Sequence, residues 1–225
     1  MCGRITISVS KQELRDYLYR YFQIGDFDVE YTLPRYNVGP GQMLIAIIND
    51  GQKNRVGLLK WGFIPHFSKD EKSGPMLINA RAETVSEKPA YRNAFRKQRC
   101  LILADSYFEW QKKDNDKIPM RIMVKESPIF TLAGLWSVYV KEDGSKLGTC
   151  TIITTSASKD VGFIHDRMPV ILTQQTQNLW IQKEDPQELS QLLLPYPEGN
   201  LTSYQVSKIV NSPKNDLPEC IIPVK

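Results

Sequence analysis

The chain has 225 residues, of which 41% are hydrophobic and 24% are charged, and its formal net charge is +4. This length and composition predict a globular protein with one sizeable core, and we expect a single domain over residues 1–225. No apolar run approaches the roughly 18 residues that a membrane helix needs. Charged residues interrupt the first twenty positions, so we expect no signal peptide and a cytoplasmic location. The mild positive charge permits a polyanionic partner without requiring one.

The four cysteines, at positions 2, 100, 150 and 220, and the two histidines are too widely spaced for a zinc-binding pattern. We therefore expect no metal ion and no other cofactor. Cys100 and Cys150 lie in apolar, strand-like runs that are typical of core residues, and disulfides are rare in cytosolic proteins. Cys2 differs from them because it lies at the start of the chain.

Hydrophobic and polar residues alternate over residues 4–9, a pattern that predicts a half-buried strand. Ile5 and Ile7 share its apolar face. Extending the alternation backwards places Cys2 on the polar face beside Arg4, so the start of the chain need not belong to the core.

A helix is expected next, because Ser10 and Glu13 form a capping-box pattern before apolar residues at helical spacing. Further helices are expected at residues 87–97, 175–183 and 186–194. In the last of these, Asp185 is the expected N-cap and Pro186 occupies the first turn.

Short strands account for much of the remaining chain. They are predicted at residues 43–48, 55–61, 76–83, 100–104, 120–124, 129–140, 149–155 and 169–173. Asp143-Gly144 indicates a hairpin turn within residues 141–148. Many short strands with few helices predict an α+β fold, in which a mixed, mostly antiparallel sheet curls toward a barrel with helices at its periphery.

The first chemical motif is the start of the chain itself, Met1-Cys2-Gly3-Arg4. A methionine before a small side chain is normally removed, which would leave Cys2 as the first residue. An N-terminal cysteine carries an amine of pKa about 7.7–8.0 and a thiol of pKa about 8.5 on adjacent carbons. With an aldehyde, the amine forms an imine and the thiol then closes a thiazolidine ring. The alternative is a cysteine that occupies position 2 by accident.

Two further motifs carry polar side chains suited to catalysis or binding. Asn79, Arg81 and Glu83 share one face of the strand expected at residues 76–83. They could orient a substrate and bind a phosphate, or they could form an exposed strand edge. Glu109 follows an apolar strand, and partial burial should raise its pKa toward the range useful for proton transfer. Its alternative role is a structural pair with an arginine.

The remaining candidates are single residues and one basic segment. His165 lies beside charged residues before a strand, which suits an acid–base role or a structural one. Thr154 could donate a hydrogen bond to a phosphate, and Trp61 could stack on an unpaired base or belong to the core. Residues 91–100 carry four basic side chains and no acidic one, with Arg99 expected on an outer helix face. Such a segment is either a nucleic-acid-binding face or a solvated one.

Taken in order, these motifs resemble the SRAP (SOS-response-associated peptidase) family. The matching segments are residues 1–4 (Met-Cys-Gly-Arg), 36–40 (Tyr-Asn-Val-Gly-Pro), 61–65 (Trp-Gly-Phe-Ile-Pro), 79–84 (Asn-Ala-Arg-Ala-Glu-Thr), 99–102 (Arg-Cys-Leu-Ile), 107–110 (Tyr-Phe-Glu-Trp) and 165–169 (His-Asp-Arg-Met-Pro). The resemblance covers about residues 2–210 and is closer to the bacterial and phage members than to the longer eukaryotic one. One departure is Gly39-Pro40-Gly41, where the family often has Ala-Pro-Thr.

The resemblance implies a sensor of abasic sites in single-stranded DNA that forms a covalent DNA–protein crosslink and removes its own initiating methionine. A monomer is expected, because a protein that acts at one lesion needs no partner subunit. It implies Cys2 as the nucleophile, Asn79 and Glu109 as residues that position and deprotonate the terminal amine, and His165 as the residue that helps to open the sugar ring. The implied DNA contacts are Arg4, Asn37, Pro40, Trp61, Arg81, Thr154 and Arg167.

Three alternatives remain open at this stage. An N-terminal-nucleophile amidotransferase would use the same cysteine to attack an amide. A thiol peptidase acting on other proteins would pair Cys2 with His165. A plain single-strand-binding module would use the basic residues of 91–100 and would form no crosslink.

Overall fold

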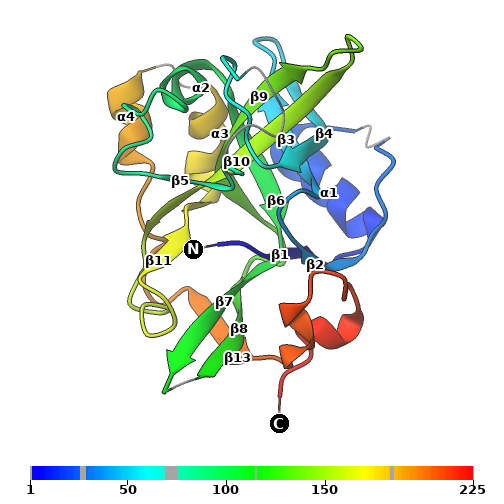
Figure 1. The fold of residues 1–225 in the computed structure, drawn as a ribbon, viewed down its shortest axis with the longest axis vertical. Helices are drawn as coiled ribbons and strands as arrows, with labels where there is room; N and C mark the ends of the chain where they lie inside the picture. Colours follow the sequence, from blue (N-terminus) through cyan, green and yellow to red (C-terminus); the bar gives the residue numbers. More distant parts are fainter. Residues whose placement is uncertain (1, 26–28, 69–75, 115, 183–184, 225) are drawn as a thin grey trace.

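The structure is a computed structural model that describes residues 2–25, 29–68, 76–114, 116–182 and 185–224. Its strands form one five-stranded and one eight-stranded sheet, with helices around the larger one (Figure 1). The elements in chain order are β1 (Ile5–Ile7), α1 (Lys11–Phe22), β2 (Arg35–Val38), β3 (Met43–Asn49), β4 (Asn54–Trp61), β5 (Asn79–Arg81), α2 (Arg92–Lys97), β6 (Arg99–Ala104), β7 (Ser106–Lys113), β8 (Asp116–Val124), β9 (Phe130–Val140), β10 (Lys146–Ser156), β11 (Arg167–Pro169), β12 (Ile171–Leu172), α3 (Gln174–Gln182), α4 (Pro186–Gln191), β13 (Leu201–Gln205) and the 3₁₀ helices η1 (Lys208–Asn211) and η2 (Pro218–Ile221).

The larger sheet closes on itself. β10 pairs with β4, β4 with β3, β3 with β6, β6 with β9, and β9 returns to β10. Only the β10–β4 pairing in this ring is parallel. Alternate side chains such as Ala46, Ile102 and Ile152 fill one buried cluster, as expected for a barrel interior. The predicted mostly antiparallel, curled α+β fold is therefore confirmed.

The smaller sheet has the strand order β13-β8-β7-β1-β2, so β1 has a neighbour on both sides. Figure 1 shows the start of the chain, in dark blue, crossing between the barrel strands and the β7–β8 hairpin. The start of the chain is thereby held at the junction of the two sheets.

The helices cover the outside of the barrel. In α1, the Ser10 side chain accepts a hydrogen bond from the Glu13 backbone N–H, and the Glu13 carboxylate accepts one from the Ser10 backbone N–H, which is the predicted capping box. Leu14 and Leu18 of α1 share a buried cluster with Trp180 of α3. None of the described helices is both long enough and apolar enough to span a membrane.

Several sequence expectations need correction. The strand expected at residues 4–9 is shorter, and Thr6 is as buried as Ile5 and Ile7, because β1 lies inside the sheet and its polar face meets Asp105 and Ser106. The strands β2, β7 and β13 were not predicted, because their sequences lack a clear alternation.

The helix expected at residues 87–97 is also shorter, since α2 begins at Arg92. Arg99 is not on an exposed helix face. It begins β6, is 7% exposed, and its guanidinium donates hydrogen bonds to the backbone carbonyls of Phe95 and Trp180. Arg99 therefore satisfies carbonyls at the ends of two helices.

Candidate functional site

Cys2 lies directly before β1 and is completely buried. The side-chain amide of Asn79 donates a hydrogen bond from Nδ2 to the backbone oxygen of Cys2, at 2.7 Å. Asn79 is the first residue of β5 and pairs with Ile152 of β10. This hydrogen bond therefore ties the start of the chain to the barrel. The alternation placed Cys2 on the polar face beside Arg4, but that face is buried too, and Cys2 is a core residue.

The burial of Cys2 controls the chemistry of its thiol. Removal from water is the largest cause, and the carboxylate of Glu109 adds to it; together they raise the pKa of the Cys2 thiol far above its usual range. The thiolate is the nucleophilic form, so a thiol in this state keeps its proton at neutral pH. A reaction at Cys2 must therefore begin at an atom other than the sulfur, or must first remove the proton from the thiol.

Glu109 lies on β7, and only 3% of its surface is exposed. β7 pairs with β1, and the backbone N–H of Phe108 donates to the oxygen of Arg4 at 2.9 Å, which brings Glu109 alongside the residues that precede β1. Burial is the largest influence on the Glu109 carboxyl, and it raises the pKa of this group above its ordinary value. Glu109 thus keeps its proton to a higher pH than an ordinary carboxyl and can act as an acid or a base.

His165 faces the same region from the other side. With Glu109 it lines a pocket of about 420 Å³. The backbone N–H of Arg167 donates to Nδ1 of His165 at 2.9 Å, so the proton of the neutral ring lies on Nε2. The carboxylate of Asp166 is 2.7 Å from the same Nδ1 and would form an ion pair only with a protonated ring. In the neutral ring, the contact with the Arg167 N–H leaves Nε2 as the donor.

Two of the expected DNA contacts are structural in this fold. Arg4 is 9% exposed, and its Nη1 donates to Oδ1 of Asn37 at 2.5 Å and to the oxygen of Val210 at 2.9 Å. Asn37 has no exposed surface, and its Nδ2 faces the backbone oxygens of Val210, Ser212 and Asn215. Both side chains therefore hold the C-terminal segment against β2.

Trp61 and Thr154 are also fully buried. The indole N–H of Trp61 donates to the oxygen of Ile78 at 2.9 Å, so the ring belongs to the core and cannot stack on a base. Arg167 donates both guanidinium nitrogens to the carboxylate of Glu83, at 2.5 and 3.0 Å. Its partner is thus a carboxylate from the 79–84 motif, and a phosphate would have to compete with it.

Pro40 and Arg81 are the expected contacts that lie exposed. Pro40 occupies the turn between β2 and β3, in which Gly41 has a φ of 84° and its N–H donates to the oxygen of Trp61 at 2.7 Å. This left-handed conformation favours glycine, which explains why Gly41 stands where the resemblance suggests a threonine.

Sequence reasoning missed part of the pocket. Its remaining walls are Trp110, Lys112 and Lys117 on the β7–β8 hairpin and Asn211 of η1. Asp114, Asn115 and Asp116, typical turn residues between two strand-like runs, were an available signal for this hairpin. The contribution of η1 depends on long-range packing and has no local signal.

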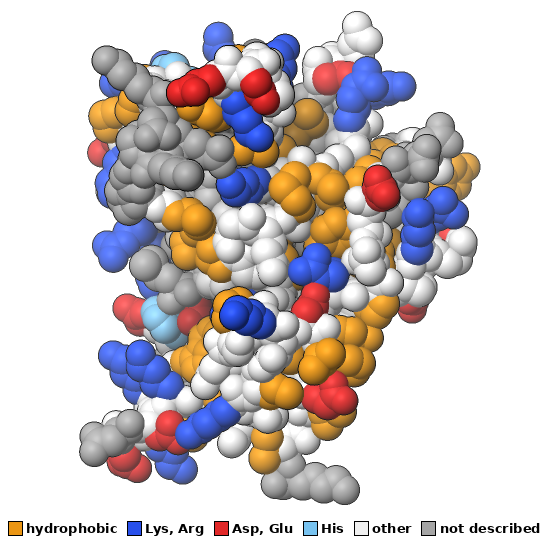
Figure 2. Space-filling view, turned by 45° about the vertical axis from the view of Figure 1, so that its right-hand side comes forward, with side chains coloured by type: hydrophobic (Ala, Val, Ile, Leu, Met, Phe, Trp, Pro, Cys, Tyr) orange, Lys and Arg blue, Asp and Glu red, His pale blue; other side chains and the backbone are white. Residues whose placement is uncertain are grey.

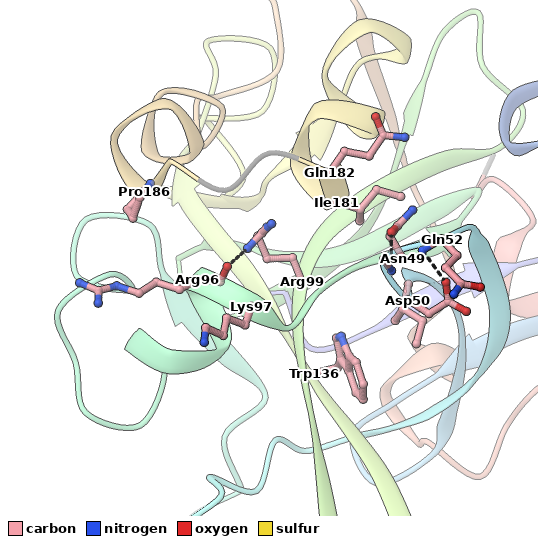
Figure 3. A pocket seen from close by; sticks show the side chains of 12 residues that line it. Asn49, Asp50, Gln52, Arg96, Lys97, Arg99, Trp136, Ile181, Gln182 and Pro186 are labelled. Carbon is pink, nitrogen blue, oxygen red and sulfur yellow. Dashed lines mark hydrogen bonds between the residues drawn. The ribbon is translucent and has the colours of Figure 1, made fainter.

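Another pocket, of about 1120 Å³, shares no lining residue with this site. Figure 3 shows Arg96 and Lys97 of α2 on one side of it and Asn49 and Gln52 on the other. Part of the basic segment 91–100 therefore lines this pocket, which lies beside the helices at the top of Figure 1. Elsewhere, basic and acidic side chains alternate over the face shown in Figure 2, without a continuous basic stripe.

The geometry can now be compared with known proteins. A family model described as SOS response associated peptidase (SRAP) matches residues 1–213. The chain belongs to the SRAP family. Within the described residues of this SRAP chain, no group of histidine, cysteine, aspartate and glutamate side chains is arranged to hold a metal ion.

SRAP relatives extend over the whole chain. The abasic site processing protein YoqW of Bacillus subtilis (strain 168) is 48% identical over 226 residues, which cover 98% of this chain and 99% of YoqW. The abasic site processing protein HMCES of Gallus gallus is 31% identical over 263 residues, covering 100% of this chain and 78% of HMCES. A crystal structure of a protein from Bacteroides thetaiotaomicron superposes with a TM-score of 0.88 at 26% identity and covers both chains completely.

The buried role of Asn37 gives a first prediction. Asn37→Ala removes the acceptor of Arg4 and leaves several backbone oxygens without their donor, which should lower the free energy of unfolding by about 3 kcal/mol. Urea denaturation would measure this loss. Asn93→Ala, on the exposed face of α2, is the matched control and should change stability by less than about 0.5 kcal/mol. Equal stabilities for the two variants would contradict the structural role.

The raised pKa of Glu109 gives a second prediction. A carboxyl whose pKa is higher in the folded than in the unfolded state destabilises the fold when it is ionised. Glu109→Gln should therefore raise the melting temperature above the folded pKa, and the gain should vanish below the unfolded value of about 4.3. Thermal unfolding at a series of pH values tests this. A variant less stable than the parent at pH 8 would show that the ionised carboxylate is stabilising.

Proposed function

We propose that this chain detects abasic sites in single-stranded DNA and forms a covalent thiazolidine crosslink to them through Cys2, after Met1 has been removed. The observation that carries the proposal is the hydrogen bond from Asn79 to the Cys2 oxygen, which holds the start of the chain beside Glu109 and His165. SRAP relatives named abasic site processing proteins support it. Met1 itself lies outside the described residues.

The substrate is an aldehyde only part of the time. An abasic deoxyribose equilibrates between a closed hemiacetal and an open form with an aldehyde at C1′. Opening the ring requires a proton on the ring oxygen and the loss of one from the C1′ hydroxyl. His165, with its proton on Nε2, is the proposed donor, and Glu109 is the other residue in the pocket that can exchange a proton.

The first covalent bond then forms at nitrogen. The terminal amine of Cys2 attacks C1′ and gives a carbinolamine, which loses one water molecule and becomes an imine. Glu109 accepts a proton from the amine before the attack and returns it to the departing hydroxyl. The raised pKa of the thiol agrees with this order. The buried thiol would have to give up a tightly held proton before it could attack, whereas the terminal amine loses its proton more easily.

The second bond forms at sulfur. The Cys2 thiol adds to the imine carbon, its proton moves to the nitrogen, and a five-membered ring closes. The sum of the two steps joins one protein to one DNA strand and releases one water molecule, with no oxidant or reductant. Asn79 fixes the backbone of Cys2 during both steps, so that amine and thiol face the same carbon.

The proposed DNA interface is smaller than the resemblance implies. Arg81 and Pro40 are exposed, and Arg167 could exchange Glu83 for a phosphate. These contacts read no base edge, so the protein should bind with little sequence preference. We also propose that it acts as a cytoplasmic monomer, because one lesion requires one terminal cysteine.

Removal of Met1 is proposed as a self-processing step, in which water cleaves the Met1–Cys2 peptide bond. Glu109 lies close enough to influence Cys2 electrostatically and would serve as the base for this hydrolysis as well. An N-terminal nucleophile suits self-processing better than cleavage of other proteins, since the cysteine is buried.

The crosslink itself is the test. Cys2→Ala should abolish the adduct that survives heat and denaturant, because no thiol remains to close the ring, while noncovalent binding changes little. Cys2→Ser keeps the amine and should give a slower adduct that requires borohydride reduction. Denaturing electrophoresis with an abasic oligonucleotide measures both.

Cys220→Ala is the matched control, because Cys220 is another buried, free cysteine. It should crosslink as the parent does. A heat-stable adduct from Cys2→Ala, or none from the parent after Met1 removal, would refute the proposal.

The acid–base role of Glu109 is tested by rate. Glu109→Gln should slow crosslinking by about 100-fold, the lower range for general acid–base catalysis, and should change affinity for DNA much less. Single-turnover kinetics at saturating DNA separate the two effects. Equal losses in rate and affinity would assign Glu109 to structure instead.

A further inference from the structure

Two lysines face each other on the β7–β8 hairpin. In its antiparallel register Lys112 lies directly opposite Lys117, and both side chains are exposed. Like charges in directly opposed positions destabilise a sheet, whereas opposite charges stabilise it. The adjacent pair in the same hairpin, Lys113 and Asp116, has the favourable combination. The Lys112–Lys117 pair therefore costs stability that the rest of the hairpin avoids.

No described carboxylate relieves this repulsion. Asp116, the nearest along the chain, is already bound by the ammonium of Lys208, at 2.7 and 2.9 Å. Within the described residues neither Lys112 nor Lys117 forms an ion pair. The two exposed lysines thus occupy directly opposed positions of the hairpin and can attract an anion from outside the protein.

The position of the pair indicates which anion. Lys112 and Lys117 line the same pocket of about 420 Å³ as Glu109 and His165. Trp110 forms another wall and is held by a hydrogen bond from its indole N–H to Oδ1 of Asn211, at 2.7 Å. An anion bound by the lysines would therefore lie in the same pocket as Glu109 and His165, the residues proposed to act on the sugar.

We propose that Lys112 and Lys117 form a phosphate subsite that holds a backbone phosphate adjacent to the abasic sugar. The inference rests on the proposed function and names a contact that the family motifs do not include. The two flanking phosphates are the only anionic groups of the substrate that stay covalently fixed next to the sugar. Ammonium groups bind phosphate as point charges. A phosphate bound between the two lysines would offset the repulsion between their positive charges.

The subsite also helps to explain how an exposed DNA strand reaches a buried cysteine. Arg4 and Thr154, two of the implied phosphate contacts, are buried, and Arg167 is paired with Glu83. The hairpin lysines are exposed and lie at the wall of the pocket instead. They supply positive charge in addition to that of the exposed Arg81.

The double variant Lys112→Gln, Lys117→Gln tests the subsite. In a Cys2→Ala background, which binds without crosslinking, fluorescence anisotropy would measure affinity for an abasic single strand over a salt series. We expect a loss of about 10-fold at low salt and a salt slope reduced by about 0.7, the value for one phosphate contact on a single strand. Lys112→Arg, Lys117→Arg should restore both, because the charge is kept.

The double glutamine variant should still form the crosslink at saturating DNA, because the cysteine that forms it is unchanged. The melting temperature should not fall, because the variant removes a repulsion. The matched control is Lys141→Gln, Lys146→Gln in the β9–β10 hairpin, which removes the same charge from a different exposed site. It should alter affinity much less.

Two failures can be told apart. If the parent protein crosslinks abasic DNA but the double glutamine variant binds with unchanged affinity and salt slope, the phosphate subsite is wrong and the proposed function stands. The subsite is equally refuted if the control variant loses as much affinity, because the effect is then that of net charge. If the parent forms no crosslink at all, the proposed function fails.

Discussion

The structure depends on how firmly the first residues of the chain are held. β1 lies between β2 and β7, and the Asn79 amide binds the oxygen of Cys2 from the barrel side. A chain terminus is ordinarily among the most mobile parts of a protein. Here it is fixed by backbone pairing on two sides and by one side-chain hydrogen bond. A reaction that requires both the amine and the thiol of one residue needs such a fixed position, because both atoms must face a single carbon.

The same arrangement carries an energetic cost. Burial raises the pKa values of the Cys2 thiol and the Glu109 carboxyl, which means that their charged forms are disfavoured. Oδ1 of Asn79 is buried and has no hydrogen-bond partner among the described residues. Polar groups in this condition reduce stability by about 1–3 kcal/mol each. The closed barrel and its layer of helices supply the stability that allows the site to persist.

The local elements could be predicted from sequence because their signals are local. The Ser10–Glu13 capping box and the Asp143-Gly144 turn are short-range patterns, and both elements form where they were expected. The motifs that contain Asn79, Glu109 and His165 were also identified in advance, and the fold brings these three residues to one region.

The remaining features depend on contacts between distant segments. Whether the polar face of β1 is exposed cannot be decided from alternation, because it depends on what covers that face. Arg4 and Asn37 looked like phosphate contacts until the segment around Val210 took up their hydrogen bonds from more than 170 residues away. The opposition of Lys112 and Lys117 exists only in the register of the hairpin.

The central claim is that the amine and the thiol of one N-terminal cysteine capture a sugar aldehyde together. The most direct measurement is the intact mass of the protein after incubation with an abasic single strand, followed by sequencing of the modified peptide. The account predicts a mass equal to that of the Met1-free chain plus the DNA strand minus one water molecule, with the modification on a peptide that begins at Cys2. An adduct on a lysine, or an unmodified N-terminal peptide, would contradict it.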